Sequence, residues 1–145
     1  MLKGIPQIIS PELIKVLMEM GHGDEIVLAD GNFPAVSHAN CLIRCDGHGI
    51  PELLEAVLQF LPIDTYVDYP IALMDVVEGD PIKPTIWKKY ETIIQDQFKY
   101  PIPIQYIDRF EFYERSKKSY AIVATSERAQ YANIILKKGV IKEFE

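Results

Sequence analysis

The sequence lacks the features that mark membrane, secreted and nucleic-acid-binding proteins. No apolar run approaches the roughly 18–20 residues of a membrane helix, because charged residues interrupt every hydrophobic stretch. Residues 1–4 are not followed by the apolar run of a secretory signal, so we expect a cytoplasmic protein. Fifteen Lys and Arg oppose 21 Asp and Glu, and the net charge of −6 argues against nucleic acid or an anionic membrane as a partner.

Cysteine is equally scarce, since Cys41 and Cys45 are the only two and cannot build a disulfide framework. On a strand they would share one face at a spacing of about 13 Å, too far apart to bond, so we expect two reduced thiols. A metal site that adds Asp46 and His48 is the alternative, but it lacks the second ligand pair that a structural zinc site needs. The sequence also contains neither GxGxxG after a strand nor GxxxxGK[ST], so we predict no nucleotide cofactor and no metal.

What remains is the composition of an ordinary globular domain. The chain has 145 residues, of which 48% are hydrophobic and 25% charged. A chain of this length buries roughly 68–70% of its unfolded surface, which is enough for a core without disulfides. We therefore expect a single domain over residues 1–145.

Helices and short apolar strands alternate along the chain. Ser10 and Pro11 are typical of a helix N-terminus, and apolar residues then recur at helical spacing until Gly21 and Gly23. The same patterns predict further helices over residues 51–61, 85–98 and 108–117, and strands over residues 26–29, 41–45, 71–77, 104–107, 120–125 and 133–137. This alternation predicts a three-layer α/β/α fold with a central, mostly parallel sheet of about six strands.

His22 stands between two glycines, in the turn that joins the first predicted helix to the first predicted strand. Flanking glycines allow a sharp bend and close approach of a ligand, and imidazole can donate and accept a proton near neutral pH. His22 is therefore a candidate acid/base, or else a surface turn residue beside a helix C-terminus. Asp30 ends the same strand, where its carboxylate could orient His22, accept a substrate hydroxyl or form a turn.

Three further candidates follow other predicted strands, beyond whose carboxyl ends an open α/β sheet binds its ligands. Arg109 offers a planar fork of five donors to sugar or carboxylate oxygens, or is a surface residue. Tyr113 lies one helical turn further on the same helix face, where packing is the expected role and contact with a ligand the alternative. Asn133, which follows Tyr131-Ala132, could bind a ligand or form a turn.

A series of short stretches keeps a characteristic order and spacing along essentially the whole chain. They are Ile9-Ser10-Pro11-Glu12-Leu13, Met20-Gly21-His22-Gly23-Asp24-Glu25-Ile26, Ala29-Asp30 with Phe33-Pro34, Ile43-Arg44 with Asp46-Gly47, Val77-Glu78-Gly79-Asp80, Arg109-Phe110 with Phe112-Tyr113-Glu114-Arg115, Glu127-Arg128-Ala129, Tyr131-Ala132-Asn133-Ile134-Ile135-Leu136 and Lys137-Lys138-Gly139-Val140. Together they resemble the family of sugar mutarotases that comprises fucose mutarotases and ribose pyranases. Arg109 before Phe-x-Phe-Tyr-Glu-Arg is similar to the fucose branch, whereas Ala132 resembles the ribose branch. The longer match favours fucose.

The resemblance implies an isomerase that interconverts the α and β anomers of L-fucopyranose, with D-ribose pyranase activity or non-catalytic sugar binding as the alternatives. It implies that His22 is the catalytic acid/base, that Asp30 and Arg109 contact the sugar, and that Tyr131, Ala132 and Asn133 complete the pocket, with no metal or cofactor. It further implies a homo-oligomer, a ring or a decamer of stacked pentamers, whose sites lie near subunit boundaries.

Overall fold

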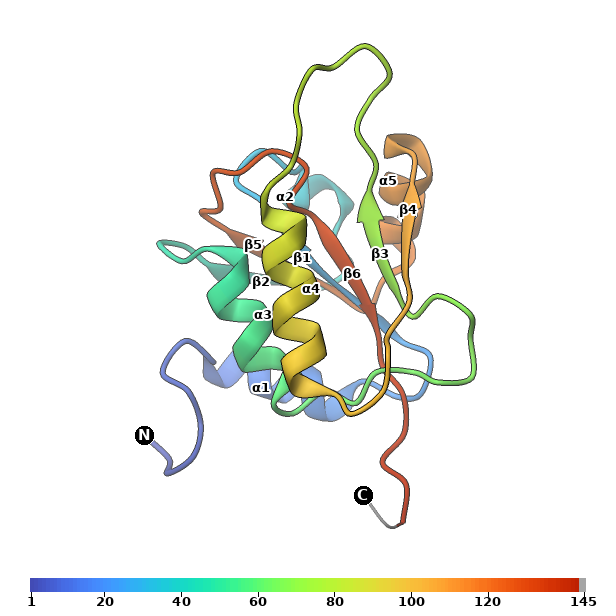
Figure 1. Ribbon diagram of the computed structural model, residues 1–145. Coiled ribbons are helices and arrows are strands. Elements are labelled where there is room, and N and C mark those ends of the chain that lie inside the picture. The colour runs from blue at the N-terminus through green and yellow to red at the C-terminus, as the bar shows by residue number, and fades with distance from the viewer. Residues whose placement is uncertain (144–145) are drawn as a thin grey trace.

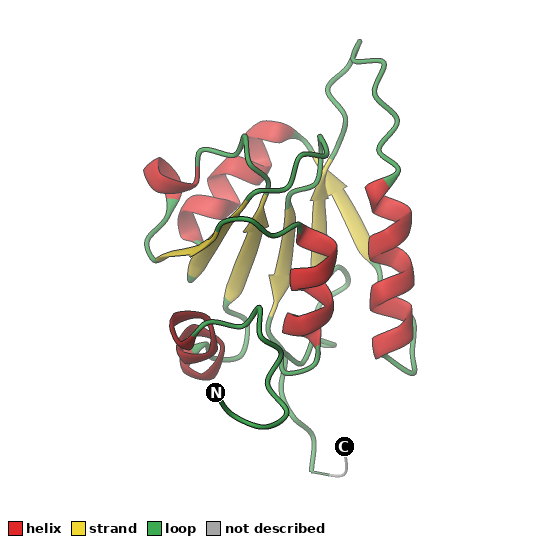
Figure 2. Cartoon of the chain, turned by 90° about the vertical axis from the view of Figure 1, so that its left-hand side faces the viewer, coloured by secondary structure: helices red, strands yellow, loops and turns green. Residues whose placement is uncertain are grey.

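A six-stranded sheet with helices on both faces forms the centre of the computed structural model, which describes residues 1–143 (Figures 1 and 2). The strands are β1 (Glu25–Ala29), β2 (Leu42–Cys45), β3 (Ile71–Met74), β4 (Ile104–Ile107), β5 (Ala121–Thr125) and β6 (Ile134–Lys137). The helices are α1 (Pro11–Glu19), α2 (Ala35–His38), α3 (Ile50–Leu58), α4 (Ile86–Gln97) and α5 (Arg109–Lys118). The predicted three-layer α/β architecture is confirmed.

The sheet is mixed, and the direction of one strand decides which loops meet. Its strand order is β2-β5-β1-β6-β3-β4. The pairs β1–β5, β2–β5 and β3–β4 are parallel, whereas β6 runs antiparallel to both of its neighbours, β1 and β3. The first five strands therefore end at one edge of the sheet, which we call the carboxyl edge, and β6 begins there.

Helix caps fix two of the segments that matter for the site. Ser10 caps α1 by accepting a hydrogen bond from the Leu13 N–H at 3.1 Å, as the sequence predicts. Asp108 caps α5, because its Oδ1 accepts from the N–H groups of Phe110 and Glu111 at 2.9 and 3.1 Å. This cap starts α5 directly after β4 and places Arg109 in its first turn at the carboxyl edge.

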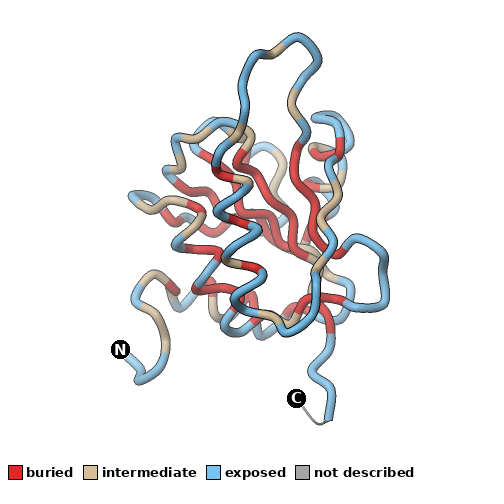
Figure 3. The backbone as a smooth tube through the Cα atoms, in the orientation of Figure 1, coloured by how far each residue is buried: buried red, intermediate tan, exposed pale blue. Residues whose placement is uncertain are grey.

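The core lies on the two faces of the sheet, whose four central strands β5, β1, β6 and β3 are almost wholly buried, whereas the edge strands β2 and β4 are partly exposed (Figure 3). On one face, α1, α3 and α4 pack against the strands and contribute the fully buried Leu13, Leu53 and Tyr90. On the other face, α5 contributes the fully buried Phe112 and α2 the small Ala35. These two layers hold the sheet rigid, so the loops at its carboxyl edge start from fixed positions.

Two local predictions need correction. The one-turn helix α2 was not predicted, because four residues are too few to show a helical period. β3 ends at Met74 and not at residue 77, since the chain leaves the sheet at Asp75. Residues 75–85 form a projecting loop, visible at the top of Figure 1. Cys41 and Cys45 are both free thiols, as expected.

Candidate functional site

Five of the seven predicted site residues meet in one cavity at the carboxyl edge. The cavity has a volume of about 290 Å³ and is lined by residues that include Asp30, Arg109, Tyr113, Tyr131 and Asn133. Asp30 follows β1, Arg109 and Tyr113 lie on α5, and the other two belong to the loop between β5 and β6. They converge because β6 is inverted, which brings the residues before it to the edge where β1 and β4 end.

Asp30 and Asn133 are joined by a hydrogen bond at the back of this cavity. The Asp30 backbone N–H donates to Oδ1 of Asn133 at 2.7 Å, and both residues are buried. The carboxylate of Asp30 accepts from the Asn32 N–H at 2.9 Å. Because the Asn133 oxygen is occupied by Asp30, its amide N–H groups are the part of that side chain suited to bind a ligand oxygen.

The Asp30 carboxyl lies in an environment that resists its charge. Burial raises the pKa of Asp30, although hydrogen bonds from the backbone N–H groups of Asn32, Phe33 and Ala132 oppose the shift. The ionised form is therefore costly in the unliganded protein. Such a carboxylate gains from a hydroxyl donor of a bound molecule, because the new hydrogen bond replaces lost hydration.

Tyr131 has a backbone conformation that few residues other than glycine adopt, with φ at 56°. The left-handed region costs a non-glycine residue roughly 1 kcal/mol or more, so neighbouring contacts must hold it. Nε1 of Trp87 donates to the Tyr131 carbonyl at 2.8 Å, and the buried Tyr90 hydroxyl donates to the Ala132 carbonyl at 2.7 Å. Two aromatic residues of α4 thus fix the path of this loop, and Ala132 serves through its backbone because it is fully buried.

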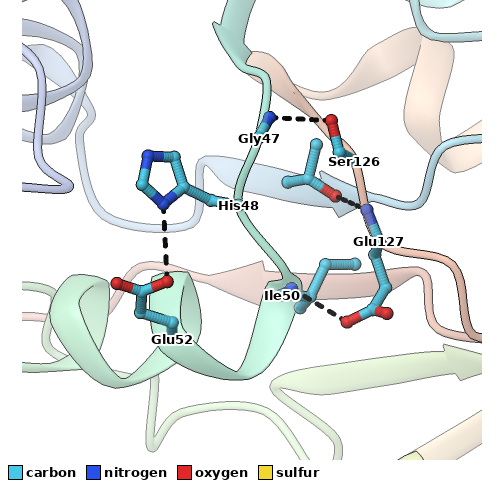
Figure 4. Close-up of polar contacts among 7 residues, drawn as sticks. Gly47, His48, Ile50, Glu52, Ser126 and Glu127 are labelled. Carbon is cyan, nitrogen blue, oxygen red and sulfur yellow. Dashed lines mark hydrogen bonds and ion pairs between the residues drawn. The ribbon is translucent and has the colours of Figure 1, made fainter.

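Glu127 ties the same loop to two other segments, and Figure 4 shows its bond to the first of them, at Ile50. Its Oε1 accepts from the Ile50 N–H at 3.1 Å, and its Oε2 accepts from the Ala129 N–H at 3.0 Å. Its backbone carbonyl accepts from the Gly31 N–H at 2.9 Å, next to Asp30. One residue therefore connects the start of α3, the β5–β6 loop and the turn after β1.

Aromatic rings and a cation form the outer wall of the cavity. The Tyr113 ring packs edge-on against Phe33 and His38, with centroids 5.6 and 5.4 Å apart. Arg109 is exposed and lies over the Phe110 ring, with Cζ 4.8 Å from its centroid. The cavity thus combines a fixed aromatic surface with guanidinium, amide and carboxylate groups, which suits a small polyhydroxylated molecule.

His22 lies outside this cavity, at the other end of β1. The five residues of that strand separate its turn from Asp30 by about 16 Å at ~3.3 Å per residue, so Asp30 does not orient His22 within one chain. Asp64 has that role, since its Oδ1 lies 3.0 Å from Nε2 of His22. Asp64 is 3% exposed and His22 is 45% exposed, so a buried carboxylate holds an imidazole that faces outward.

The end of β6 brings Asp64 and the His22 turn together. The Gly23 N–H donates to the Lys138 carbonyl at 2.8 Å, and the Asp64 N–H donates to the Lys137 carbonyl at 3.0 Å. A Cβ at Gly139 would lie 2.7–2.8 Å from the backbone of residues 63–64, so only glycine permits this approach. Burial resists ionisation of Asp64, but hydrogen bonds from the Tyr66 N–H and from His22 outweigh it and lower its pKa.

Sequence reasoning missed several side chains of this arrangement besides Asp64. Met74 and Asp80 line the cavity, and Trp87 and Tyr90 hold the Tyr131 loop. Asp80 belongs to a stretch that the sequence singled out, but its role depends on contacts that no spacing reveals. Trp87 and Tyr90 fit the apolar pattern of α4, so only their N–H and O–H groups hint at a second role.

Two features common in other proteins are not found in the part of the chain that the structure describes. Among residues 1–143, no group of three or more His, Cys, Asp or Glu side chains is placed to hold a metal ion. None of the helices in this range has the length and apolar character needed to cross a membrane.

The fold is a three-layer α/β architecture, and its cavity at the carboxyl edge suits a small polyhydroxylated molecule. Residues 3–141 match the family described as the RbsD / FucU transport protein family. The chain belongs to this family.

Curated relatives and a solved structure are similar to almost the whole chain. The fucose mutarotase of Mus musculus is 53% identical over 146 residues, which cover 97% of this chain and 95% of the relative. The L-fucose mutarotase of Actinobacillus pleuropneumoniae is 48% identical over 140 residues, with 97% of both chains covered. The crystal structure of the fucose mutarotase from Streptococcus pneumoniae in complex with L-fucose is 60% identical, covers 97% of this chain and 100% of its own, and superposes with a TM-score of 0.93.

Proposed function

We propose that this protein is an L-fucose mutarotase, a single-domain isomerase over residues 1–145 that interconverts the α and β anomers of L-fucopyranose. The cavity that joins Asp30, Asn133 and Arg109 with an aromatic wall carries the proposal, because it offers a small sugar both acceptors and donors. The similarity to fucose mutarotases over 97% of the chain supports the same substrate.

The reaction needs only proton transfers. A base removes the proton of the anomeric hydroxyl while an acid protonates the ring oxygen, so that the C1–O5 bond breaks and a C1 carbonyl forms. Rotation about C1–C2 then presents the other face of the carbonyl to the C5 hydroxyl. Closure reverses the two proton transfers, and no group is gained or lost. A well-placed acid/base typically contributes ~10²–10⁴-fold to such a step.

The cavity residues bind and orient the sugar in this proposal. Asp30 accepts a hydrogen bond from a sugar hydroxyl, which offsets the cost of its buried charge. The free amide N–H groups of Asn133 and the guanidinium of Arg109 donate to other oxygens of the sugar. Tyr113 and Tyr131 cover the apolar C–H face of the ring.

His22 supplies the acid/base from a second copy of the chain. Its imidazole is 45% exposed and lies at the opposite end of β1 from the cavity, so it suits the cavity of a neighbouring copy. Asp64 then acts as the positioning residue that fixes the imidazole. We further propose that the copies assemble as a ring, in the form of a decamer of stacked pentamers, and that the enzyme works in the cytoplasm.

Saturation-transfer NMR of anomer exchange tests this function directly. The purified protein is added to equilibrated L-fucose, D-ribose or D-galactose, and the exchange rate between the two anomers is measured against buffer. We expect the largest acceleration with L-fucose. Rates at the buffer value for all three sugars would overturn the proposal, and fucose binding without exchange would favour a sugar-binding accessory protein. Native mass spectrometry of the same sample gives the number of copies.

A further inference from the structure

The loop of residues 75–85, between β3 and α4, is fastened to the rest of the molecule at a residue of the sugar cavity. Most of this loop is exposed, and it projects from the carboxyl edge (Figures 1 and 2). The Tyr131 hydroxyl donates to Oδ2 of Asp80 at 2.5 Å and accepts from the Val77 N–H at 3.3 Å. A single phenol oxygen of the β5–β6 loop therefore makes hydrogen bonds to two residues of the projecting loop.

These contacts use the Tyr131 hydroxyl as an anchor. A phenol has one proton to donate, and Tyr131 gives it to Asp80, so that proton is already committed when a sugar enters. The Tyr131 carbonyl is held by Trp87, which follows the projecting loop in the first turn of α4. The segment from β3 to α4 thus holds Tyr131 at both its side chain and its backbone.

Asp80 is itself fixed, and both of its oxygens are in use. Its Oδ1 accepts from the Ile82 N–H at 3.1 Å, and its own N–H donates to the Val77 carbonyl at 3.0 Å. Asp80 also lines the cavity that contains Asp30 and Arg109. An aspartate suits this place because two oxygens meet two donors, whereas an asparagine offers only one oxygen.

We propose that Asp80 is a positioning residue of the sugar site, which holds the Tyr131 ring against the cavity and fastens the 75–85 loop as a wall of that site. This inference rests on the proposed function, because the site is defined by sugar binding. Asp80 acts through Tyr131. Removing its carboxylate therefore displaces the Tyr131 ring, and sugar binding changes only as a consequence of that displacement.

The Asp80→Asn variant tests the hydrogen bond to Tyr131 by NMR, in an experiment that does not depend on enzyme activity. The Asp80 carboxylate raises the pKa of the Tyr131 hydroxyl by accepting a hydrogen bond from it. In protein that carries isotope-labelled tyrosine, the resonance absent from Tyr131→Phe belongs to Tyr131. We expect D80N to shift that resonance and to move its titration to lower pH. An unchanged Tyr131 resonance would show that Asp80 does not hold the ring, whatever the enzyme does.

A double-mutant cycle then measures whether Asp80 acts through Tyr131 in the reaction. We expect D80N to lower kcat/KM for fucose exchange about tenfold, since displaced substrate-positioning groups cost at least this much. In the Tyr131→Phe background the same substitution should have no further effect. Equal losses in both backgrounds, or full activity of D80N, would overturn the inference.

Two controls separate this role from a general structural one. Glu78→Gln removes an exposed carboxylate from the same loop and should leave exchange unchanged. Asp80→Glu keeps two oxygens and should recover part of the activity that D80N loses. If the wild-type protein itself does not accelerate exchange, the proposed function fails. If the wild type is active and D80N is equally active, only the positioning role of Asp80 fails.

Discussion

His22 and Asp30 lie at opposite ends of β1, and the five residues of that strand keep them apart within one chain. His22 contacts Asp64 near the end of β6, whereas Asp30 contacts Asn133 at the carboxyl edge. If both act on one sugar, a complete site needs two copies of the chain. This arrangement makes the activity of mixed oligomers predictable.

Two inactive variants should restore activity when they are mixed. We expect His22→Ala and Arg109→Ala each to lower fucose exchange by at least about tenfold, because they remove the acid/base and a sugar contact. After co-refolding in equal amounts, about a quarter of the sites should pair an intact His22 with an intact cavity. NMR exchange rates measure the recovery.

The matched control mixes Arg109→Ala with Asn133→Ala, whose defects lie in the cavity of the same chain. Every cavity in that mixture carries one of the two substitutions, so activity should stay low. Recovery in this control, or none in the first mixture, contradicts a site shared between copies.

Asp64→Asn should impair the acid/base without removing it. Oδ1 of the buried carboxylate lies 3.0 Å from Nε2 of His22, and an uncharged amide in its place holds the imidazole less firmly. We expect fucose exchange to fall by about tenfold or more. In the His22→Ala background the substitution should have no added effect, and an equal loss there would assign Asp64 a separate role.

The same variant should lose stability in a pH-dependent way. The pKa of Asp64 is lowered in the folded protein, so its ionised form adds stability that is present above the ordinary carboxyl pKa of about 3.9. That stability is lost as the pH falls through the lowered value. Thermal unfolding should therefore give a lower Tm for D64N than for wild type at pH 7, and the gap should close in acid.

Asp30→Asn should show the opposite pattern. Burial raises the pKa of Asp30, so the stabilisation that its protonated form gives is fully present below about pH 4 and is lost as the pH rises through the raised value. We expect D30N to have a higher Tm than wild type at pH 7, with fucose exchange at least about tenfold lower because a sugar acceptor is lost. A lower Tm at pH 7 would contradict the cost assigned to the buried charge.

Glu127→Gln tests whether the junction of three loops matters for the site. An amide keeps one acceptor oxygen where the carboxylate serves Ile50 on one side and Ala129 on the other. We expect a fall in Tm and an increase in KM for fucose, because the substitution weakens the support of the start of α3 or of the Tyr131 loop, whereas the backbone bond to the Asp30 turn is kept. Glu52→Gln, which removes an exposed partner of His48, is the matched control and should leave KM unchanged.

Much of the fold was predictable because helix caps and apolar periodicity are local sequence patterns. Ser10 and Asp108 cap their helices through hydrogen bonds to residues two or three positions away, so composition near a helix end suffices to place it. The four central strands were predictable because buried strands of a sheet covered on both faces form short apolar runs, and the partly exposed edge strands β2 and β4 keep enough apolar residues to show a strand pattern. Two errors remain. The helix α2 was missed because it has only four residues, and the end of β3 was placed too late because the chain leaves the sheet there.

The sequence by itself determined the alternation of helices and strands, the chemistry of the candidate side chains and the resemblance to a family of sugar mutarotases. Only the tertiary structure decided which of these side chains meet. The inverted direction of β6 carries Asn133 to Asp30 and carries Lys137 and Lys138 to the turn of His22 and to Asp64. Strand direction follows from packing and pairing across the whole sheet, so it cannot be predicted from the residues within and next to the strand. For that reason His22 and Asp30, only eight positions apart in the sequence, belong to opposite ends of the molecule.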